Sequence, residues 1–180
     1  MVAPEDILAF WLDDIGPEGW YVADAALDAK IRDRFLDAWT GAMEGRYALW
    51  LTYPSGTLAY LILRDQFSRN MFRGEARAFS SDRVAIAAAK SAIAKGYDLK
   101  IDPPARQFFY LPFMHSEDLQ DQDRAVRLYE ALGDESSLRF ARQHREIIAR
   151  FGRFPHRNAA LGRDTTAEEQ AFLDEGGFGG

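Results

Sequence analysis

The stretch TLAYLILRDQFSRNMFRG, residues 57–74, sets the constraint around which the rest of this chain must fold. Its first part, Thr57 to Leu63, is apolar on nearly every face of a helix, so we expect this helix to be central. The helix then runs into polar residues. Asp65 and Arg69 continue the apolar row that begins at Leu58, which puts a charged i,i+4 pair on a core-facing row. Buried charges need partners, so this row requires an explanation.

Helical patterns recur on both sides of the stretch. From Asp24 to Gly45, apolar residues step by four along the sequence, and Asp24 is a suitable N-cap. No segment alternates convincingly with period two. We therefore expect an all-α fold of about eight helices in antiparallel hairpins, forming one domain over residues 1–180. The glycine-rich segment 176–180 is expected to be a flexible tail.

The ends of the other helices are marked by residues typical of caps. Ser81 and Ser116 are expected N-caps, and a serine at 136 or 137 is expected near the start of the following helix. Gly133 is a suitable C′ residue. The last helix should begin at Thr165 or Thr166, with an acid three residues on to form a capping box.

Composition narrows the possible partners and compartments. The formal net charge is −6 and the pI is about 5.1, which argues against duplex nucleic acid as the main partner. There is no cysteine, and no apolar run approaches the length of a membrane span. The N-terminus carries acids where a signal peptide would carry basic residues. We expect a cytoplasmic, soluble protein, and the sequence is silent on its oligomeric state.

Within this acidic chain, residues 142–163 form a basic island that holds two of the three histidines. His144 shares a helical stripe with Ile147 and Phe151, so it is expected to point inward, bonded to a carboxylate or a carbonyl. The loop after Gly152 is the better candidate for function, because donors at a helix end suit a phosphate or carboxylate. These donors are Arg153, His156, Arg157, Asn158 and Arg163. The alternative is a loop held down by arginine–carboxylate pairs.

Two further polar clusters stand elsewhere in the chain. His115 and Glu117 flank a helix start, where they could serve as general base and orienting group, or Glu117 could simply complement the helix dipole. The second cluster follows the apolar helix and repeats the Arg-Asn pair of residues 157–158, which suggests that two Arg-Asn elements meet across one cleft. Its candidate ligand-binding residues are Arg64, Asp65, Gln66, Arg69, Asn70 and Arg73.

Cofactor motifs do not appear in this sequence. His115, His144 and His156 could in principle join a carboxylate around a metal, but their spacing matches no compact ligand motif. There is no phosphate loop, no dinucleotide-binding glycine pattern and no nucleophile elbow. We therefore expect no metal and no cofactor.

Three runs, LRDQFSRNMFRG (63–74), FFYLPFMHSEDLQDQ (108–122) and RFGRFPHRNAALGR (150–163), resemble the signature blocks of the bacterial family called domain of unknown function 924. The segments ILAFW (7–11), IRDRF (31–35) and TTAEEQAFL (165–173) follow in the same order. The resemblance implies an all-helical domain similar to tetratricopeptide-like superhelices, and it implies no activity. Ser68 stands where the family commonly has proline, which is expected to loosen that helix end slightly. No consensus tetratricopeptide repeat is visible.

Three functional hypotheses follow. The first is a polar cleft that binds a small anion, with a hydrolytic or other acid–base step if there is chemistry, His115 or His156 acting as base and Glu117 or Asp65 orienting it. The second is a tetratricopeptide-like module that binds a peptide or a partner helix without catalysis. The third is that the polar clusters hold the fold together and the function lies elsewhere. A structure in which these side chains are scattered, or are all mutually paired with no open pocket, would refute the first hypothesis.

Overall fold

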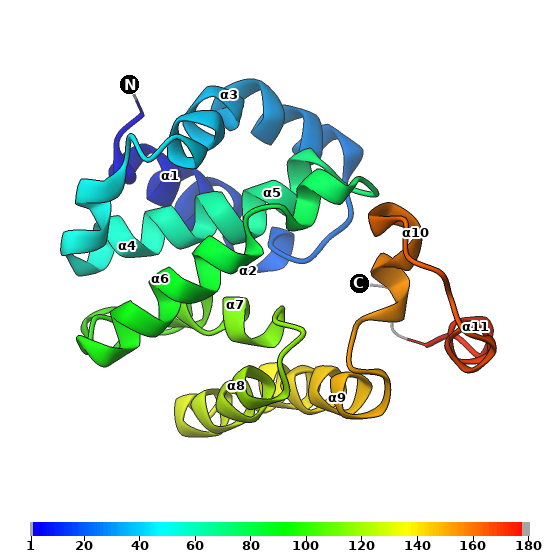
Figure 1. Ribbon diagram of the computed structural model, residues 1–180. Coiled ribbons are helices and arrows are strands. Elements are labelled where there is room, and N and C mark those ends of the chain that lie inside the picture. The colour runs from blue at the N-terminus through cyan, green and yellow to red at the C-terminus, as the bar shows by residue number, and fades with distance from the viewer. Residues whose placement is uncertain (1, 178–180) are drawn as a thin grey trace. The chain divides into compact units, whose positions relative to one another are not determined.

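A computed structural model describes residues 2–177, and this part of the chain is helical with no strand (Figure 1). The predicted all-α fold is confirmed. Contacts divide the chain into two units, the first with residues 1–73 and 77–112 and the second with residues 74–76 and 113–180. Each unit is described by itself below, and a single domain stays a prediction. No helix of residues 2–177 combines the length and the apolar character needed to span a bilayer.

The first unit begins with a helix that changes its winding. An α-helical turn passes directly into a π-helical segment, and the helix ends at Gly16, whose φ of 68° suits glycine. The long helix that follows is capped as predicted, because the Asp24 carboxylate accepts hydrogen bonds from the amides of Ala26 and Leu27. The segments are α1 (Pro4–Leu8), η1 (Ala9–Ile15), α2 (Gly16–Gly19) and α3 (Ala25–Met43).

The apolar stretch of the sequence forms the buried helical run of this unit. The run is continuous and consists of α4 (Pro54–Leu61), the π-helical η3 (Ile62–Gln66) and α5 (Phe67–Met71), preceded by the 3₁₀ segment η2 (Ala48–Thr52). It packs on α1, α3 and α6. Every residue of η3 is buried, including the consecutive polar residues Arg64, Asp65 and Gln66. A π-helical turn inside an α-helix is rare and is often found at functional sites.

Aromatic rings fill the core beside this run. Phe67 lies at its centre, with ring centroids 4.9 Å from Phe35 and 5.3 Å from Trp11. Phe10 contacts the same ring at 6.0 Å. Edge-to-face and tilted rings at these separations add to the free energy of burial. The central helix predicted from the sequence is therefore central in the first unit.

The hydroxyls of Ser68 and Ser81 form hydrogen bonds within the first unit. Ser81 precedes α6 but makes no side-chain cap, and its hydroxyl instead donates to the Arg64 carbonyl. Ser68 is fully buried, accepts from the Trp39 indole N–H at 2.6 Å and lies 2.8 Å from the Ser81 hydroxyl. The Ser68 hydroxyl therefore joins three elements, whereas the expected loosening of the helix end by serine in place of proline stays a prediction. The remaining segments are η4 (Ala76–Phe79), α6 (Asp82–Ala94), η5 (Asp98–Lys100), η6 (Ala105–Phe109) and α7 (Leu111–Met114), of which η4 and α7 each contain a boundary between units.

In the second unit, α8 (Leu119–Leu132) and α9 (Glu135–Phe151) form a hairpin that turns at Gly133 (Figure 1). Gly133 has a φ of 77° and ends α8 as predicted. The predicted N-cap at Ser116 is wrong by two residues, because Asp118 caps α8. The helix expected from a serine at 136 or 137 begins at Glu135, and Asp134 caps it. A carboxylate accepts amide hydrogen bonds at these positions as a serine hydroxyl would.

The chain ends with η7 (Pro155–Arg157), α10 (Asn158–Leu161) and α11 (Ala167–Asp174). The predicted capping box is present, since Thr166 and Glu169 bond each other's backbone amides. The amides of Gly176 and Gly177 donate to the carbonyls of Leu173 and Phe172 at the end of α11, and a flexible tail stays a prediction. The rest of the predicted tail, residues 178–180, lies outside the described residues.

Replacing Ser68 by alanine should lower the free energy of unfolding by about 1–3 kcal/mol, because the buried Trp39 N–H loses its acceptor. Chemical denaturation followed by tryptophan fluorescence measures this change. Ser91→Ala, at an exposed position of α6, is the control and should change stability by less than about 0.5 kcal/mol. Equal stabilities of the two variants would contradict the role given to the Ser68 hydroxyl.

Candidate functional site

The predicted charged row of the first unit is an ion-pair network. The Arg69 guanidinium donates to both oxygens of Asp82 at 3.1 Å, and its Nη1 lies 3.1 Å from Oδ1 of the buried Asp65. The predicted i,i+4 pair is therefore present. Burial alone would lower the pKa of Arg69, but the two carboxylates outweigh it and raise that pKa. The Arg69 guanidinium is therefore positively charged and is paired with carboxylates.

The neighbouring candidates are engaged in the same way. Arg73 donates from Nε to one Asp28 oxygen at 2.7 Å and from Nη2 to the other at 3.0 Å. Asn70 donates to Asp28 at 2.8 Å, and Gln66 donates to Asp65. These side chains hold α3 and the helical run together without any ligand. As ligand-binding residues they remain predictions.

Arg64 differs from every other arginine of this cluster. Its side chain is 1% exposed, yet its Nε and Nη1 have no hydrogen-bond partner. No carboxylate among residues 2–177 forms an ion pair with it. Burial lowers the pKa of Arg64, with the Tyr60 hydroxyl as the opposing influence. A buried cation without a counterion costs several kcal/mol, so this group needs an account.

Aromatic rings surround the Arg64 guanidinium. Its Cζ lies 5.9 Å from the ring centroid of Trp39 and 5.9 Å from that of Tyr60. Contacts of this kind recover part of the charge's lost hydration, but they supply no hydrogen-bond acceptor for Nε or Nη1. Burial raises the pKa of the Tyr60 hydroxyl, so this group keeps its proton at neutral pH and is able to donate. The cluster therefore offers donors and a positive charge.

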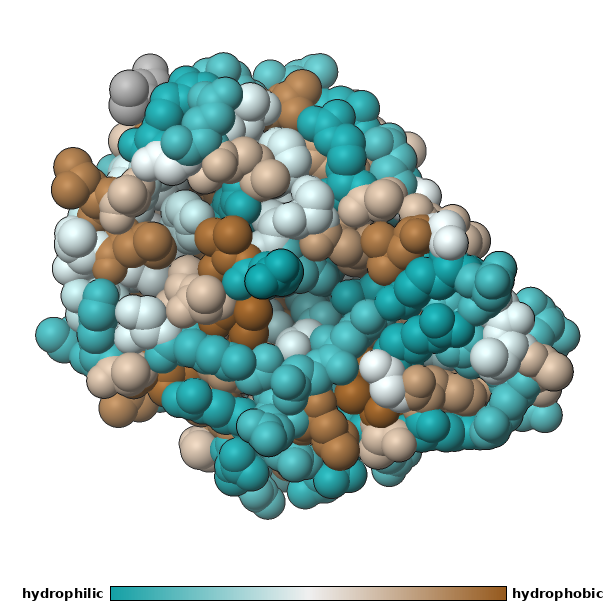
Figure 2. Space-filling view, viewed as in Figure 1, coloured by the Kyte–Doolittle hydropathy of each residue, from teal (hydrophilic) through white to brown (hydrophobic). Residues whose placement is uncertain are grey.

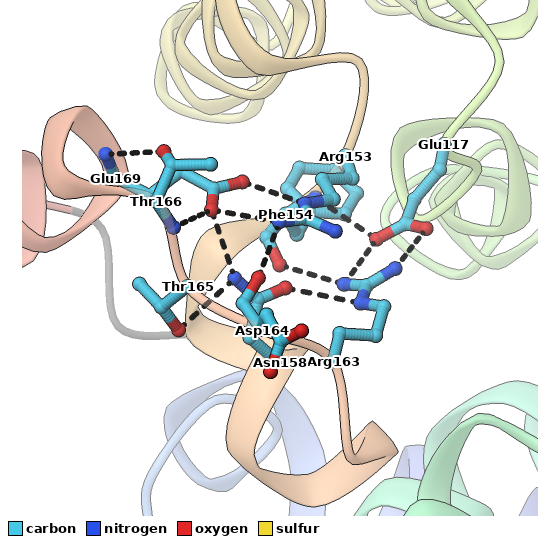
Figure 3. A network of polar contacts seen from close by, with 9 residues as sticks. All are labelled: Glu117, Arg153, Phe154, Asn158, Arg163, Asp164, Thr165, Thr166 and Glu169. Carbon is cyan, nitrogen blue, oxygen red and sulfur yellow. Dashed lines mark hydrogen bonds and ion pairs between the residues drawn. The ribbon is translucent and has the colours of Figure 1, made fainter.

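In the second unit, Glu117 anchors the loop that follows α9 (Figure 3). The Arg163 guanidinium donates to both Glu117 oxygens, at 2.8 and 3.0 Å, and the Phe154 amide donates to one of them at 2.9 Å. Burial would raise the pKa of Glu117, but these donors and the nearby Arg157 together lower it. Glu117 is therefore an ionised partner of Arg163, which leaves it poorly suited to accept a proton in catalysis.

Glu169 organises the other half of the same network. It accepts from Arg153 Nε and Nη2 at 2.6 and 2.8 Å, and from Asn158 at 3.2 Å. The Arg153 hydrogen bond is the main cause that lowers the pKa of Glu169 to about 2, opposed by burial and aided by the Thr166 amide. Arg163 also donates to the Asn158 side-chain oxygen. Arg153, Asn158 and Arg163 are thus used to close the loop onto α11.

Two histidines flank Phe154, and the third lies beside one of them. The Phe154 ring lies 5.5 Å from that of His144 and 5.6 Å from that of His156, and the Arg157 Cζ lies 4.5 Å above it. The ring centroids of His115 and His144 are 6.4 Å apart, and the Arg157 guanidinium donates to the His115 carbonyl at 3.0 Å. The predicted catalytic residues His115 and His156 are therefore in one neighbourhood, whereas a catalytic role stays a prediction.

His144 is the inward-facing histidine that the sequence predicts. Its Nδ1 bonds the Phe140 carbonyl at 2.8 Å, and because a carbonyl only accepts, Nδ1 carries the proton. Burial, then the nearby His115 and the positive Arg157, lower the pKa of His144 to about 3. The ring is neutral over the physiological range.

The two Arg-Asn elements fall in different units, so a cleft shared by them stays a prediction. Sequence reasoning missed Trp39, Tyr60 and Arg77 as neighbours of a candidate site. Tyr60 lies four residues before Arg64 and could have been found by helical spacing, but the other two come from separate elements. No group of residues within 2–177 has the composition and placement of a metal site.

The fold and these clusters define an all-helical protein. Its candidate site residues lie in three short blocks of the sequence. A structure of a protein of unknown function from Agrobacterium tumefaciens is similar to this chain, with a TM-score of 0.91 and 44% sequence identity. The match covers 96% of this chain and 97% of that one. No curated protein matches the sequence.

A family model described as bacterial protein of unknown function (DUF924) matches residues 7–177. The chain belongs to this family, as the resemblance of its signature blocks implied. The family description names no activity, so function must be argued from the residues of this chain.

Replacing Arg163 by methionine should lower the free energy of unfolding by about 2 kcal/mol, because it leaves the half-buried Glu117 carboxylate without its bidentate partner. Arg142→Met is the matched control, since its 3.7 Å pair with Glu130 is exposed and worth less than about 0.5 kcal/mol. A double-mutant cycle with Glu117→Gln measures the coupling directly. Absence of coupling would contradict a structural role for the network.

Lowering the pH should destabilise the protein through His144. The unfolded-state pKa of about 6.5 exceeds the folded-state value, so the unfolded chain takes up a proton that the folded ring refuses. The contribution is complete above about pH 6.5, and about 2 kcal/mol of it is lost by pH 5. Denaturation of the wild type and of His144→Gln at pH 7.5 and 5.0 tests this, because the variant should lose less. The contribution of Glu169 to the free energy of unfolding is lost in a separate pH range, below its unfolded-state pKa near 4.5. Identical losses in both proteins would refute the assignment.

Proposed function

We propose that this protein binds a small anion, a carboxylate or a phosphate, at the buried guanidinium of Arg64. The observation that carries the proposal is a fully buried arginine whose Nε and Nη1 have no hydrogen-bond partner. An anion in contact with these nitrogens would provide the missing acceptors and the missing charge. Arginine suits this task because its fork of donors matches both carboxylate and phosphate oxygens.

Four of the other candidate arginines support the choice by contrast. Arg69 and Arg73 in the first unit, and Arg153 and Arg163 in the second, each form ion pairs with carboxylates. In these four cases the fold provides the counterion, whereas Arg64 has none among residues 2–177. A purely structural arginine would be expected to have an acid beside it, because burial without one is costly.

The surroundings of Arg64 suit a small ligand that is partly apolar. The rings of Trp39 and Tyr60 lower the local dielectric and strengthen an ionic contact, and the protonated Tyr60 hydroxyl is a further donor. Hydrolysis needs a base beside the ligand, and no histidine contact is among the contacts that support the Arg64 site. Binding is therefore what we propose for Arg64, without a catalytic step.

A peptide-binding role has less support. The face in Figure 2 shows hydrophobic side chains in small groups separated by hydrophilic ones. The most exposed large apolar residues of the first unit, Leu49, Leu99 and Tyr21, lie on different elements. A tetratricopeptide-like module that binds a helix or peptide thus stays an alternative without a specific observation in its favour.

The experiment compares wild type with Arg64→Met by thermal denaturation and calorimetry, using acetate and inorganic phosphate as probes. Without ligand, Arg64→Met should be as stable as wild type or more stable, because an uncompensated buried charge is removed. With anion, only wild type should gain stability, by about 2.7 kcal/mol at a concentration one hundred times the dissociation constant.

Arg83→Met is the matched control, since it removes the same charge from an exposed position on α6. It should keep the anion response of wild type, which also corrects for the general stabilising effect of phosphate salts. An Arg64→Met variant that is destabilised without ligand and still responds to anions would refute the proposal. So would a wild type that binds neither probe by calorimetry.

A further inference from the structure

We propose that the ligand of the Arg64 site carries two negative charges, and that Arg77 binds the second of them. This inference rests on the proposed function and adds the ligand class to it: a small dianion such as a dicarboxylate or a phosphate monoester. Arg77 follows the helical run in the 3₁₀ segment η4 and was not among the residues that the sequence singled out.

The Trp39 indole connects the two arginines. The Arg77 Cζ lies 5.4 Å from the Trp39 ring centroid, and the Arg64 Cζ lies 5.9 Å from the same centroid. Arg77 is held in place by a second ring, since its Cζ is 4.0 Å from the centroid of Phe72. Stacking of this kind fixes a guanidinium that would otherwise move freely in solvent. Two positive charges thus lie near one indole ring.

The carboxylates that pair with the neighbouring arginines of the helical run are already engaged. Arg69 is paired with Asp82 and Asp65, and Arg73 is paired with Asp28. Neither Arg64 nor Arg77 has an ion pair with a carboxylate of residues 2–177. A dianion would neutralise both, whereas a monoanion would leave one charge uncompensated.

Burial separates the roles of the two side chains. Arg64 is 1% exposed and Arg77 is exposed, so one ligand charge would be desolvated and the other would stay near water. The rings of Trp39 and Phe72 contact the Arg77 guanidinium and offer flat apolar surface beside it. This arrangement fits a short dianion whose two charged oxygen groups, or whose phosphate oxygens, reach both guanidiniums. An exposed arginine is also expected to accelerate binding of such a ligand.

The experiment measures dissociation constants by calorimetry at pH 7.5 for butyrate, succinate and phenyl phosphate. Butyrate and succinate have the same chain length and differ by one carboxylate, and phenyl phosphate distinguishes a phosphate ester from a dicarboxylate. The proteins are wild type, Arg77→Gln and Arg83→Gln, the last being an exposed arginine of the same unit without an ion pair. Thermal denaturation checks that all three are folded.

We expect wild type to bind succinate or phenyl phosphate at least about tenfold more tightly than butyrate. Arg77→Gln should remove this preference while leaving butyrate binding unchanged, and Arg83→Gln should retain it. If butyrate binds as tightly as both dianions, and Arg77→Gln changes nothing, the dianion inference is overturned while anion binding at Arg64 stands. If none of the three probes binds, the proposed function fails and this inference fails with it.

Discussion

Removal of the helical run Pro54–Met71 from water is the constraint on which the first unit depends. A buried helix must find a partner for each polar group it carries, since none can be left to solvent. The π-helical turn at Ile62–Gln66 places three consecutive polar residues in the core. The Arg64 carbonyl accepts hydrogen bonds from the hydroxyls of Ser68 and Ser81, which joins the run to the start of α6. Trp39 on α3 completes this contact by donating to Ser68.

The charged side chains of the run meet the same requirement in two ways. Arg69 and Arg73 reach carboxylates on α6 and α3, so their charges are paired and they connect helices. The Arg64 guanidinium lies near aromatic rings and forms no ion pair with a carboxylate of residues 2–177. This part of the fold therefore does not balance its charge. That difference separates a structural arginine from a candidate for ligand binding. Ion pairs between side chains account for most of the charged candidate residues among residues 2–177. They do not account for the buried charge of Arg64.

In the second unit the same reasoning gives the opposite result. The basic island looked like an anion site because its acids are distant in the sequence. Glu117 and Glu169 come from other segments and meet Arg163 and Arg153 with bidentate geometry. The positive charge of the loop is therefore used to hold it against α11 and the start of α8. His144, neutral and bonded to a backbone carbonyl, belongs to this core and does not titrate near neutral pH.

The sequence by itself determined the helices, the burial of the central run, the Asp65–Arg69 pair, the inward position of His144 and the capping box at Thr166, because each of these depends on spacing within one element. Side-chain periodicity places residues on a helix face wherever the helix lies. Ser81 precedes α6 but makes no side-chain cap, because its hydroxyl donates to the Arg64 carbonyl. Ser116 does not cap α8, because the Asp118 carboxylate accepts the amide hydrogen bond there. Neither competing group is part of the capping pattern.

Only the tertiary structure decided which arginines are neutralised and which is not. Ion pairs between distant segments, such as Arg163 with Glu117 or Arg73 with Asp28, leave no periodic trace in a sequence. The burial of the Arg64 charge without a paired carboxylate of residues 2–177, and its nearness to Trp39, depend on how α3 and the central run pack. Electrostatic energy depends on distances in space, and separation along the chain does not reveal them.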